Sequence, residues 1–204
     1  MTAIETNINN FKCDLKNDNF SNQYIVRKYL CNGSSPVLDD DIMFQIKHKI
    51  SEKFKIHPNE VIITGSGKLG FSIAPDKKYR PFNDDSDIDV AIISERLFND
   101  FWLELLNFNI NLTSRTQNEN ENYNKFKDYF FKGWIRPDLF PFNYKDKRTW
   151  FNFFSNLTHE LYSYGDHKVA AGIFKNFEAF EIYNIQNIKS LRKSTDLEKY
   201  NDRD

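Results

Sequence analysis

Apolar residues along this chain follow two different periods. In several segments they recur every three or four residues, which places them on one face of a helix. The clearest case has apolar residues at Ile42, Ile46, Ile50 and Phe54, directly after three aspartates that favour the positive end of a helix dipole. Helices are expected over residues 22–30, 37–54, 94–108, 123–131, 147–164 and 176–191.

Short apolar runs in two other places predict buried strands. Val61-Ile62-Ile63 is β-branched and bounded by turn residues, and residues 86–93 alternate polar and apolar before becoming wholly apolar. Residues 168–174 fit either a further strand or the start of the last helix. The combination predicts an α/β (α+β) fold with a short mixed sheet flanked by helices.

The same pattern divides the chain into four parts. Residues 1–20 are polar and rich in Asn, and are expected to form a flexible arm. Residues 21–145 hold both strands and are expected to form the main domain. A C-terminal helical portion, 146–193, should pack on it, and 194–204 should be a charged tail that frays.

Composition and charge narrow the class of protein. The 204 residues are 40% hydrophobic and 16% aromatic, enough for a real core. The formal net charge is −1, so any attraction to nucleic acid must come from a local patch. The chain starts without a signal-peptide pattern and has no apolar window of membrane-spanning length, which predicts a cytoplasmic protein without a membrane partner.

The stretch VIITGSGKLG, residues 61–70, resembles phosphate-binding loops. A Walker A loop fails because Ile62 stands where its first glycine belongs and Leu69 where its Ser or Thr belongs. A Rossmann pattern matches by letter at Gly65, Gly67 and Gly70, but no clear helix is expected to follow.

Asp87-Ile88-Asp89 could supply the metal ligands that a phosphate-binding loop of this kind needs. In an extended strand, residues i and i+2 point to the same side, so both carboxylates project together while Ile88 enters the core. Two carboxylates held so close repel each other and are best explained by a shared divalent cation.

Gly65-Ser66 and Asp87-Ile88-Asp89-Val90 together resemble the polymerase-beta-type nucleotidyltransferase superfamily, in its small bacterial form. Its signature is an apolar strand, then Gly-Ser, then Asp-x-Asp in a second apolar strand. The resemblance covers residues 61–93 and implies a nucleotidyltransferase domain within 21–145. The gap between the two motifs is longer than in minimal members, so residues 75–85 are interpreted as an inserted loop.

The resemblance implies an enzyme that moves an NMP group from an NTP, such as ATP, to a hydroxyl acceptor and releases pyrophosphate. The acceptor stays open between RNA, a protein side chain, a small molecule and a second nucleotide. Gly65 and Ser66 would bind the triphosphate, with Lys68 neutralising its charge. Asp87 and Asp89 would hold Mg²⁺, with Mn²⁺ as the alternative.

Many members of this superfamily add a third carboxylate that helps to activate the acceptor. Asp138, in the proline-bounded segment GWIRPDLFP, is the first candidate, and Arg136 beside it is a candidate phosphate contact. Asp166 and Glu178 are the alternatives. None of the three acids stands in an apolar strand.

Two functions of other classes remain open. A partner or antitoxin-like protein could keep the fold and work by association without catalysis. Lys77, Lys78 and Arg80 could instead bind a nucleic acid, although the aspartates of the same loop nearly cancel their charge, which favours a solvated loop.

Overall fold

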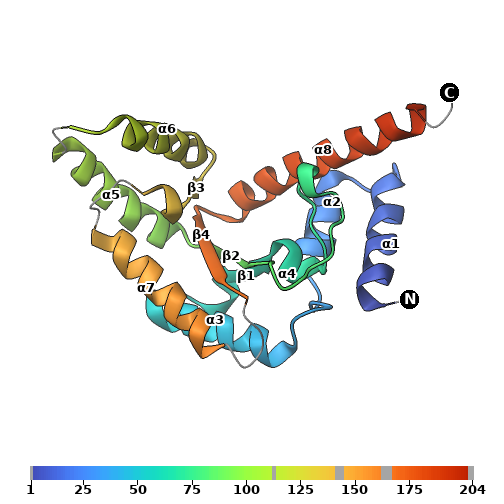
Figure 1. Ribbon diagram of the computed structural model, residues 1–204, viewed down its shortest axis with the longest axis horizontal. Helices are drawn as coiled ribbons and strands as arrows, with labels where there is room; N and C mark the ends of the chain where they lie inside the picture. Colours follow the sequence, from blue (N-terminus) through green and yellow to red (C-terminus); the bar gives the residue numbers. More distant parts are fainter. Residues whose placement is uncertain (1, 112–113, 141–144, 162–166, 202–204) are drawn as a thin grey trace.

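A computed structural model describes residues 2–111, 114–140, 145–161 and 167–201. Helices surround a small four-stranded mixed sheet, which confirms an α+β architecture (Figure 1). The helices are α1 (Ala3–Lys16), α2 (Asn22–Val26), α3 (Asp40–Phe54), α4 (Gly65–Leu69), α5 (Glu95–Asn111), α6 (Gln117–Phe131), α7 (Lys145–Glu160) and α8 (Phe177–Asn201). Shorter helical turns are Arg27–Cys31, Pro58–Glu60, Pro75–Lys77 and Pro137–Leu139.

The strands are β1 (Val61–Thr64), β2 (Ile88–Ile93), β3 (Trp134–Ile135) and β4 (Val169–Phe174), arranged in the order β1-β2-β4-β3. The central pair, β2 and β4, is parallel, and the two outer strands run antiparallel to their neighbours. Both predicted strands are confirmed, and the segment left open at 168–174 is a strand.

The two faces of the sheet cover separate hydrophobic cores. Ile88, Val90 and Ile92 pack toward α3, α5, α6 and α7, whereas Ala91 and Ile93 pack toward α1, α2 and α8. This alternation follows from the two-residue period of β2. Asp89 therefore shares the face of Ala91 and Ile93, on the α8 side.

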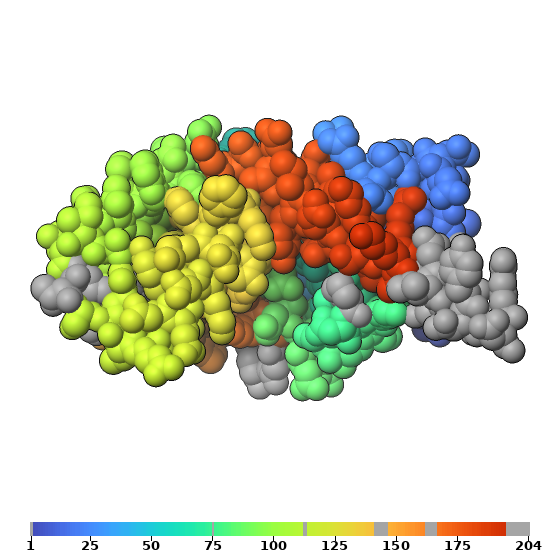
Figure 2. Space-filling view, turned by 90° about the horizontal axis from the view of Figure 1, so that it is seen from above, coloured from blue at the N-terminus to red at the C-terminus, as the bar shows by residue number. Residues whose placement is uncertain are grey.

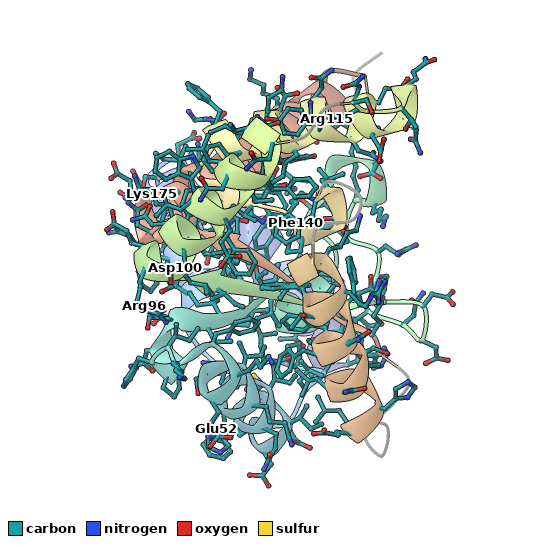
Figure 3. The ribbon with its side chains drawn as sticks, turned by 90° about the vertical axis from the view of Figure 1, so that its left-hand side faces the viewer. Glu52, Arg96, Asp100, Arg115, Phe140 and Lys175 are labelled. Carbon is teal, nitrogen blue, oxygen red and sulfur yellow. The ribbon has the colours of Figure 1, made fainter. Side chains whose placement is uncertain are left out.

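The first core is rich in aromatic contacts. Phe140, almost fully buried, lies in the interior near Phe101 of α5 and Phe126 of α6, with ring centroids 5.6 Å and 6.2 Å away (Figure 3). On the outer surface of α5, Arg96 and Asp100 form an exposed ion pair.

The prediction of a flexible arm at residues 1–20 is wrong, because most of this segment forms helix α1. Thr2 and Glu5 form a reciprocal capping box at its start. Phe11 and Leu15 are buried, and the Phe11 ring lies 4.9 Å from that of Tyr29. Ile4, Ile8, Phe11 and Leu15 recur at helical spacing, a pattern in the sequence that indicates this helix.

The expected helical C-terminal portion is also corrected. It contains β4, which lies between β2 and β3, so residues from both sides of position 146 build one sheet. Helix α8 runs to Asn201 instead of ending near residue 191, which places most of the expected frayed tail in the helix. Helix α6, expected over residues 123–131, begins earlier, at Gln117, with a capping box formed by Thr116 and Glu119.

None of the described helices is both long and apolar enough to cross a membrane.

Candidate functional site

The glycine-rich stretch is a strand followed directly by a helix. Thr64 ends β1, and the next five residues form the one-turn helix α4, which ends at Gly70 in the left-handed conformation with φ +81°. This single turn lies within the glycine pattern, and no α-helix follows Gly70 before β2, as expected. Gly65 itself has φ +63°, a value that favours glycine and that sets the direction of the turn.

The register of the sheet brings this turn to the acidic pair. Thr64 lies opposite Asp89 in the antiparallel pairing of β1 and β2. A Cβ atom added to Gly65 would lie 2.7 Å from Asp89 Oδ2, closer than real side chains approach. The backbone of Gly65 and the carboxylate of Asp89 are thus immediate neighbours.

Asp87 and Asp89 are exposed, while Ile88 and Val90 between and beside them are buried. This is the orientation predicted from the strand period. Although Asp89 is exposed to the solvent in part, the protein around it removes some of its hydration, and this desolvation, reinforced by the charge of Asp87, raises its pKa to about 6. Ionised Asp89 is therefore costly in the protein alone.

Both aspartates line a cleft of about 1010 Å³. It opens below α8, between the loop that follows α4 and the segment around β3 (Figure 2). Gly65 and Ser66 line it too, and so does Asp138. The structure thus gathers five of the six predicted site residues in one cavity.

Four basic side chains also line this cleft: Lys77, Arg80, Arg136 and Lys168. They match its four carboxylates, Asp85, Asp87, Asp89 and Asp138, in number. Three of the cations, Lys77, Arg136 and Lys168, lie near enough to Asp89 to oppose the rise of its pKa. A cleft with mixed charges of this kind suits a polyanion bound together with a cation.

Comparison with protein-family models, curated proteins and solved structures found no match for this chain.

The candidate third carboxylates have three different outcomes. Asp138 accepts two hydrogen bonds from Arg136, from Nε to Oδ1 at 3.1 Å and from the terminal nitrogen to Oδ2 at 2.7 Å. Asp166 lies outside the described residues. Glu178 is exposed in the first turn of α8 and does not line the cleft.

Over the ranges that the structure describes, no three His, Cys, Asp or Glu side chains are grouped so as to hold a metal ion. Asp87 and Asp89, two residues apart in the lining of the cleft, are the pair that could hold a metal ion here. That set fits Mg²⁺, which commonly takes one or two carboxylates and completes its shell with water and substrate phosphates.

Lys68 does not join the other predicted residues. Its side chain is buried and its Nζ donates to the carbonyl oxygen of Gly33. It lines a second, smaller pocket instead of the cleft. The letters of the motif could not show that Ser66 and Lys68, two residues apart, would lie on opposite sides of one helical turn.

Sequence reasoning missed two parts of the site. Lys168 comes from the start of β4, a segment without any motif, and only the parallel pairing of β2 with β4 brings it to the cleft. Trp134 and Tyr183 form an aromatic wall of the same cleft, with ring centroids 4.7 Å apart. Neither set has a spacing in the sequence that could have identified it.

The contact between Gly65 and Asp89 can be tested with a matched pair of variants. Gly33 also has a positive φ, +77°, but a Cβ there would meet nothing within 4 Å. We expect Gly33→Ala to lower the free energy of unfolding by about 1 kcal/mol through backbone strain alone. Gly65→Ala should cost roughly 1 kcal/mol more, because the Asp89 carboxylate must turn away.

Urea denaturation of both variants measures this difference. In an Asp89→Ala background the excess cost of Gly65→Ala should disappear, since the clashing atoms are gone. Equal costs of Gly33→Ala and Gly65→Ala in the wild-type background would contradict the geometry.

The raised pKa of Asp89 predicts a pH-dependent stability. The pKa of Asp89 in the folded protein, about 6, exceeds its ordinary value of 3.8. Asp89 is therefore protonated and costs no folding free energy below about pH 4, and the cost of ionising it grows as the pH rises to about 6. In metal-free buffer at pH 8, Asp89→Asn should therefore melt above the wild type. Since the side chain contacts solvent, we expect roughly 1 kcal/mol, or about 2–4 °C.

Melting temperatures of the two proteins between pH 3.5 and 8 measure this effect. The difference between the two melting temperatures should grow between pH 4 and 6 and stay constant above pH 6. If the two proteins melt at the same temperature at pH 8, or if the difference is as large at pH 3.5 as at pH 8, Asp89 is not desolvated.

Proposed function

We propose that this protein is a metal-dependent nucleotidyltransferase, which moves an NMP group from an NTP to a hydroxyl acceptor and releases pyrophosphate. The observation that carries the proposal is the contact between the Gly65 backbone and the Asp89 carboxylate. Two motifs 20 residues apart resemble one superfamily, and they meet in a single cleft. The proposed fold is accordingly that of the nucleotidyltransferases.

The triphosphate would lie along the turn between β1 and α4. The half-buried Ser66 offers a hydroxyl, and glycine at position 65 lets the phosphates approach the main chain closely. Lys77, Arg80 and Lys168 would neutralise its remaining charge. Lys68, which the sequence favoured for this task, is left out because it lies in the second pocket.

Asp87 and Asp89 would hold Mg²⁺, or Mn²⁺ in its place. A bound divalent cation supplies a positive charge that stabilises an attacking hydroxyl and a departing pyrophosphate. The two carboxylates then keep the charge that desolvation otherwise penalises at Asp89. The cost of ionised Asp89 in the protein alone is thereby offset when the substrate complex forms.

Asp138 is the proposed group that orients the acceptor hydroxyl or takes its proton. It lines the cleft, and its bidentate pair with Arg136 fixes its direction. The guanidinium of Arg136 also lies 4.8 Å from the ring centre of Tyr129, which limits its movement. The acceptor itself, whether RNA, protein, small molecule or nucleotide, is not selected by these contacts.

A second candidate function is nucleotide binding without transfer, by a partner or antitoxin-like protein. One observation favours it: in the described part of the chain no third acid joins Asp87 and Asp89 in a metal-binding group. Such a protein would bind an NTP and Mg²⁺ and release no pyrophosphate.

Pyrophosphate release with Mg²⁺ and each of the four NTPs, over a panel of RNA, protein and small-molecule acceptors, separates the two functions. We expect Asp87→Asn and Asp89→Asn each to reduce release by about 10³-fold, because each removes half of the metal's protein ligands. Asp84→Asn is the matched control, since Asp84 is exposed and does not line the cleft.

Wild-type rates that equal those of both cleft variants would refute catalysis at this site. If NTPs bind with Mg²⁺ while no acceptor yields pyrophosphate, the second function is supported instead.

A further inference from the structure

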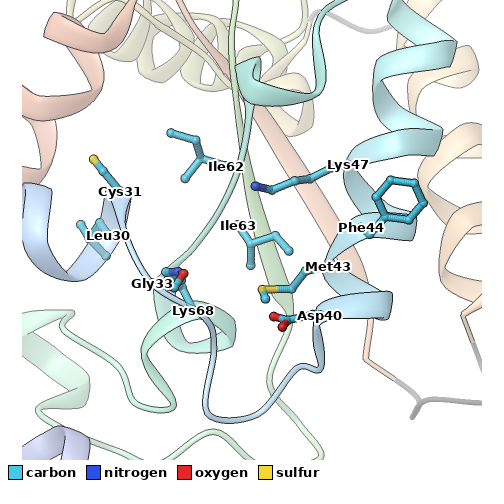
Figure 4. A pocket seen from close by; sticks show the side chains of 10 residues that line it. All are labelled: Leu30, Cys31, Gly33, Asp40, Met43, Phe44, Lys47, Ile62, Ile63 and Lys68. Atoms are coloured by element: carbon cyan, nitrogen blue, oxygen red, sulfur yellow. The ribbon is translucent and has the colours of Figure 1, made fainter.

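A second pocket of about 280 Å³ lies between the segment after α2, helix α3 and strand β1 (Figure 4). Its apolar lining comes from Leu30, Met43, Phe44, Ile62 and Ile63. Its charged lining is Lys47, Lys68 and Asp40. The proposed transfer reaction uses none of these residues.

Lys68 is the unusual group of this pocket. Only 7% of the residue is exposed, and its ammonium group donates to the carbonyl oxygen of Gly33. Among the described residues, no carboxylate forms an ion pair with Lys68 or Lys47. Desolvation, with a smaller contribution from Lys47, lowers the pKa of Lys68. The buried cation thus has a neutral hydrogen-bond acceptor but no anionic partner.

Lys47 adds a second positive charge to the same space. It extends from α3 across the pocket toward Ile62 (Figure 4). Asp40 offsets one of the two charges, which leaves the pocket with a net positive charge. Burying an ammonium group without an anionic partner is costly, and an anion between the two lysines would remove that cost.

We propose that this pocket binds a small ligand that carries one anionic group, a carboxylate or a phosphate, on an apolar body. The anionic group would lie between Lys47 and Lys68, and the apolar body would contact Met43 and Phe44. The volume is near the lower limit of ordinary ligand pockets, so the ligand is small.

The pocket is joined to the cleft through helix α4. Lys68 belongs to the same helical turn as Gly65 and Ser66. Ser35, in the segment that holds Gly33, donates from its hydroxyl to the carbonyl oxygen of Gly67 at 2.6 Å. A ligand in the pocket therefore touches the segments that position the phosphate-binding turn, although the inference does not rest on the proposed reaction.

The chain offers a specific probe for this pocket. Met43 lines it, and the only other methionine is Met1. In protein labelled with ¹³C at the methionine methyl groups, the Met43 signal reports the pocket directly. Titration with phenyl phosphate and with benzoate should shift that signal saturably, whereas neutral benzyl alcohol should bind at least about 10-fold more weakly because it lacks the charge.

Lys47→Gln should weaken the binding of the anionic probes by about 10-fold. Lys49→Gln is the matched control, because Lys49 lies on the same helix but pairs with Glu160 at 2.5 Å, outside the pocket. Asp89→Asn should leave the Met43 titration unchanged. Tighter binding of phenyl phosphate would identify phosphate as the favoured anion, and tighter binding of benzoate would identify carboxylate.

The proposal is overturned if neither anion shifts the Met43 signal at tens of millimolar concentration. It is also overturned if benzyl alcohol binds as well as the anions, or if Lys47→Gln and Lys49→Gln bind them equally.

Discussion

The close approach of the Gly65 main chain to the Asp89 carboxylate is the contact on which the whole cleft depends. It exists because β1 and β2 pair antiparallel with Thr64 opposite Asp89, so the turn after β1 must pass beside the start of β2. Any side chain at position 65 would force these groups apart. Glycine is therefore required there for two reasons, its positive φ and the lack of space.

The sheet also decides on which side of the protein the cleft lies. Alternate residues of β2 enter the core around α3 and α7, and the others face α8. At the start of the strand the α8 side is open and acidic, and farther along it is closed by Ala91 and Ile93. Asp89 is held where protein removes part of its hydration, and a bound cation with phosphates would offset that cost.

Local patterns predicted much of this architecture. The helix with Ile42, Ile46 and Ile50 is confirmed, because its apolar residues have a clear helical period. The orientation of β2, which holds Asp89 and directly follows Asp87, could be predicted from the alternation of polar and apolar residues. Helix α1 was not predicted, although Ile4, Ile8, Phe11 and Leu15 recur at helical spacing, because the polar, Asn-rich composition of residues 1–20 favoured a flexible arm.

The rest of the candidate site depends on contacts distant in sequence. Lys168 and Arg136 reach the cleft only because β4 inserts between β2 and β3, and no local pattern encodes that insertion. Lys68 shows the opposite case. It is adjacent to Gly65-Ser66 in sequence, yet the turn of α4 directs it to the second pocket, where it donates to the carbonyl oxygen of Gly33.

A crystal structure with Mg²⁺ and a non-hydrolysable ATP analogue tests the central claim most directly, that the turn and the acidic pair form one nucleotide site. We predict a metal ion held by both Asp87 and Asp89, with phosphate oxygens at the Gly65 main chain and the Ser66 hydroxyl. A nucleotide bound elsewhere, or no metal between the two aspartates at saturating Mg²⁺, would contradict the account.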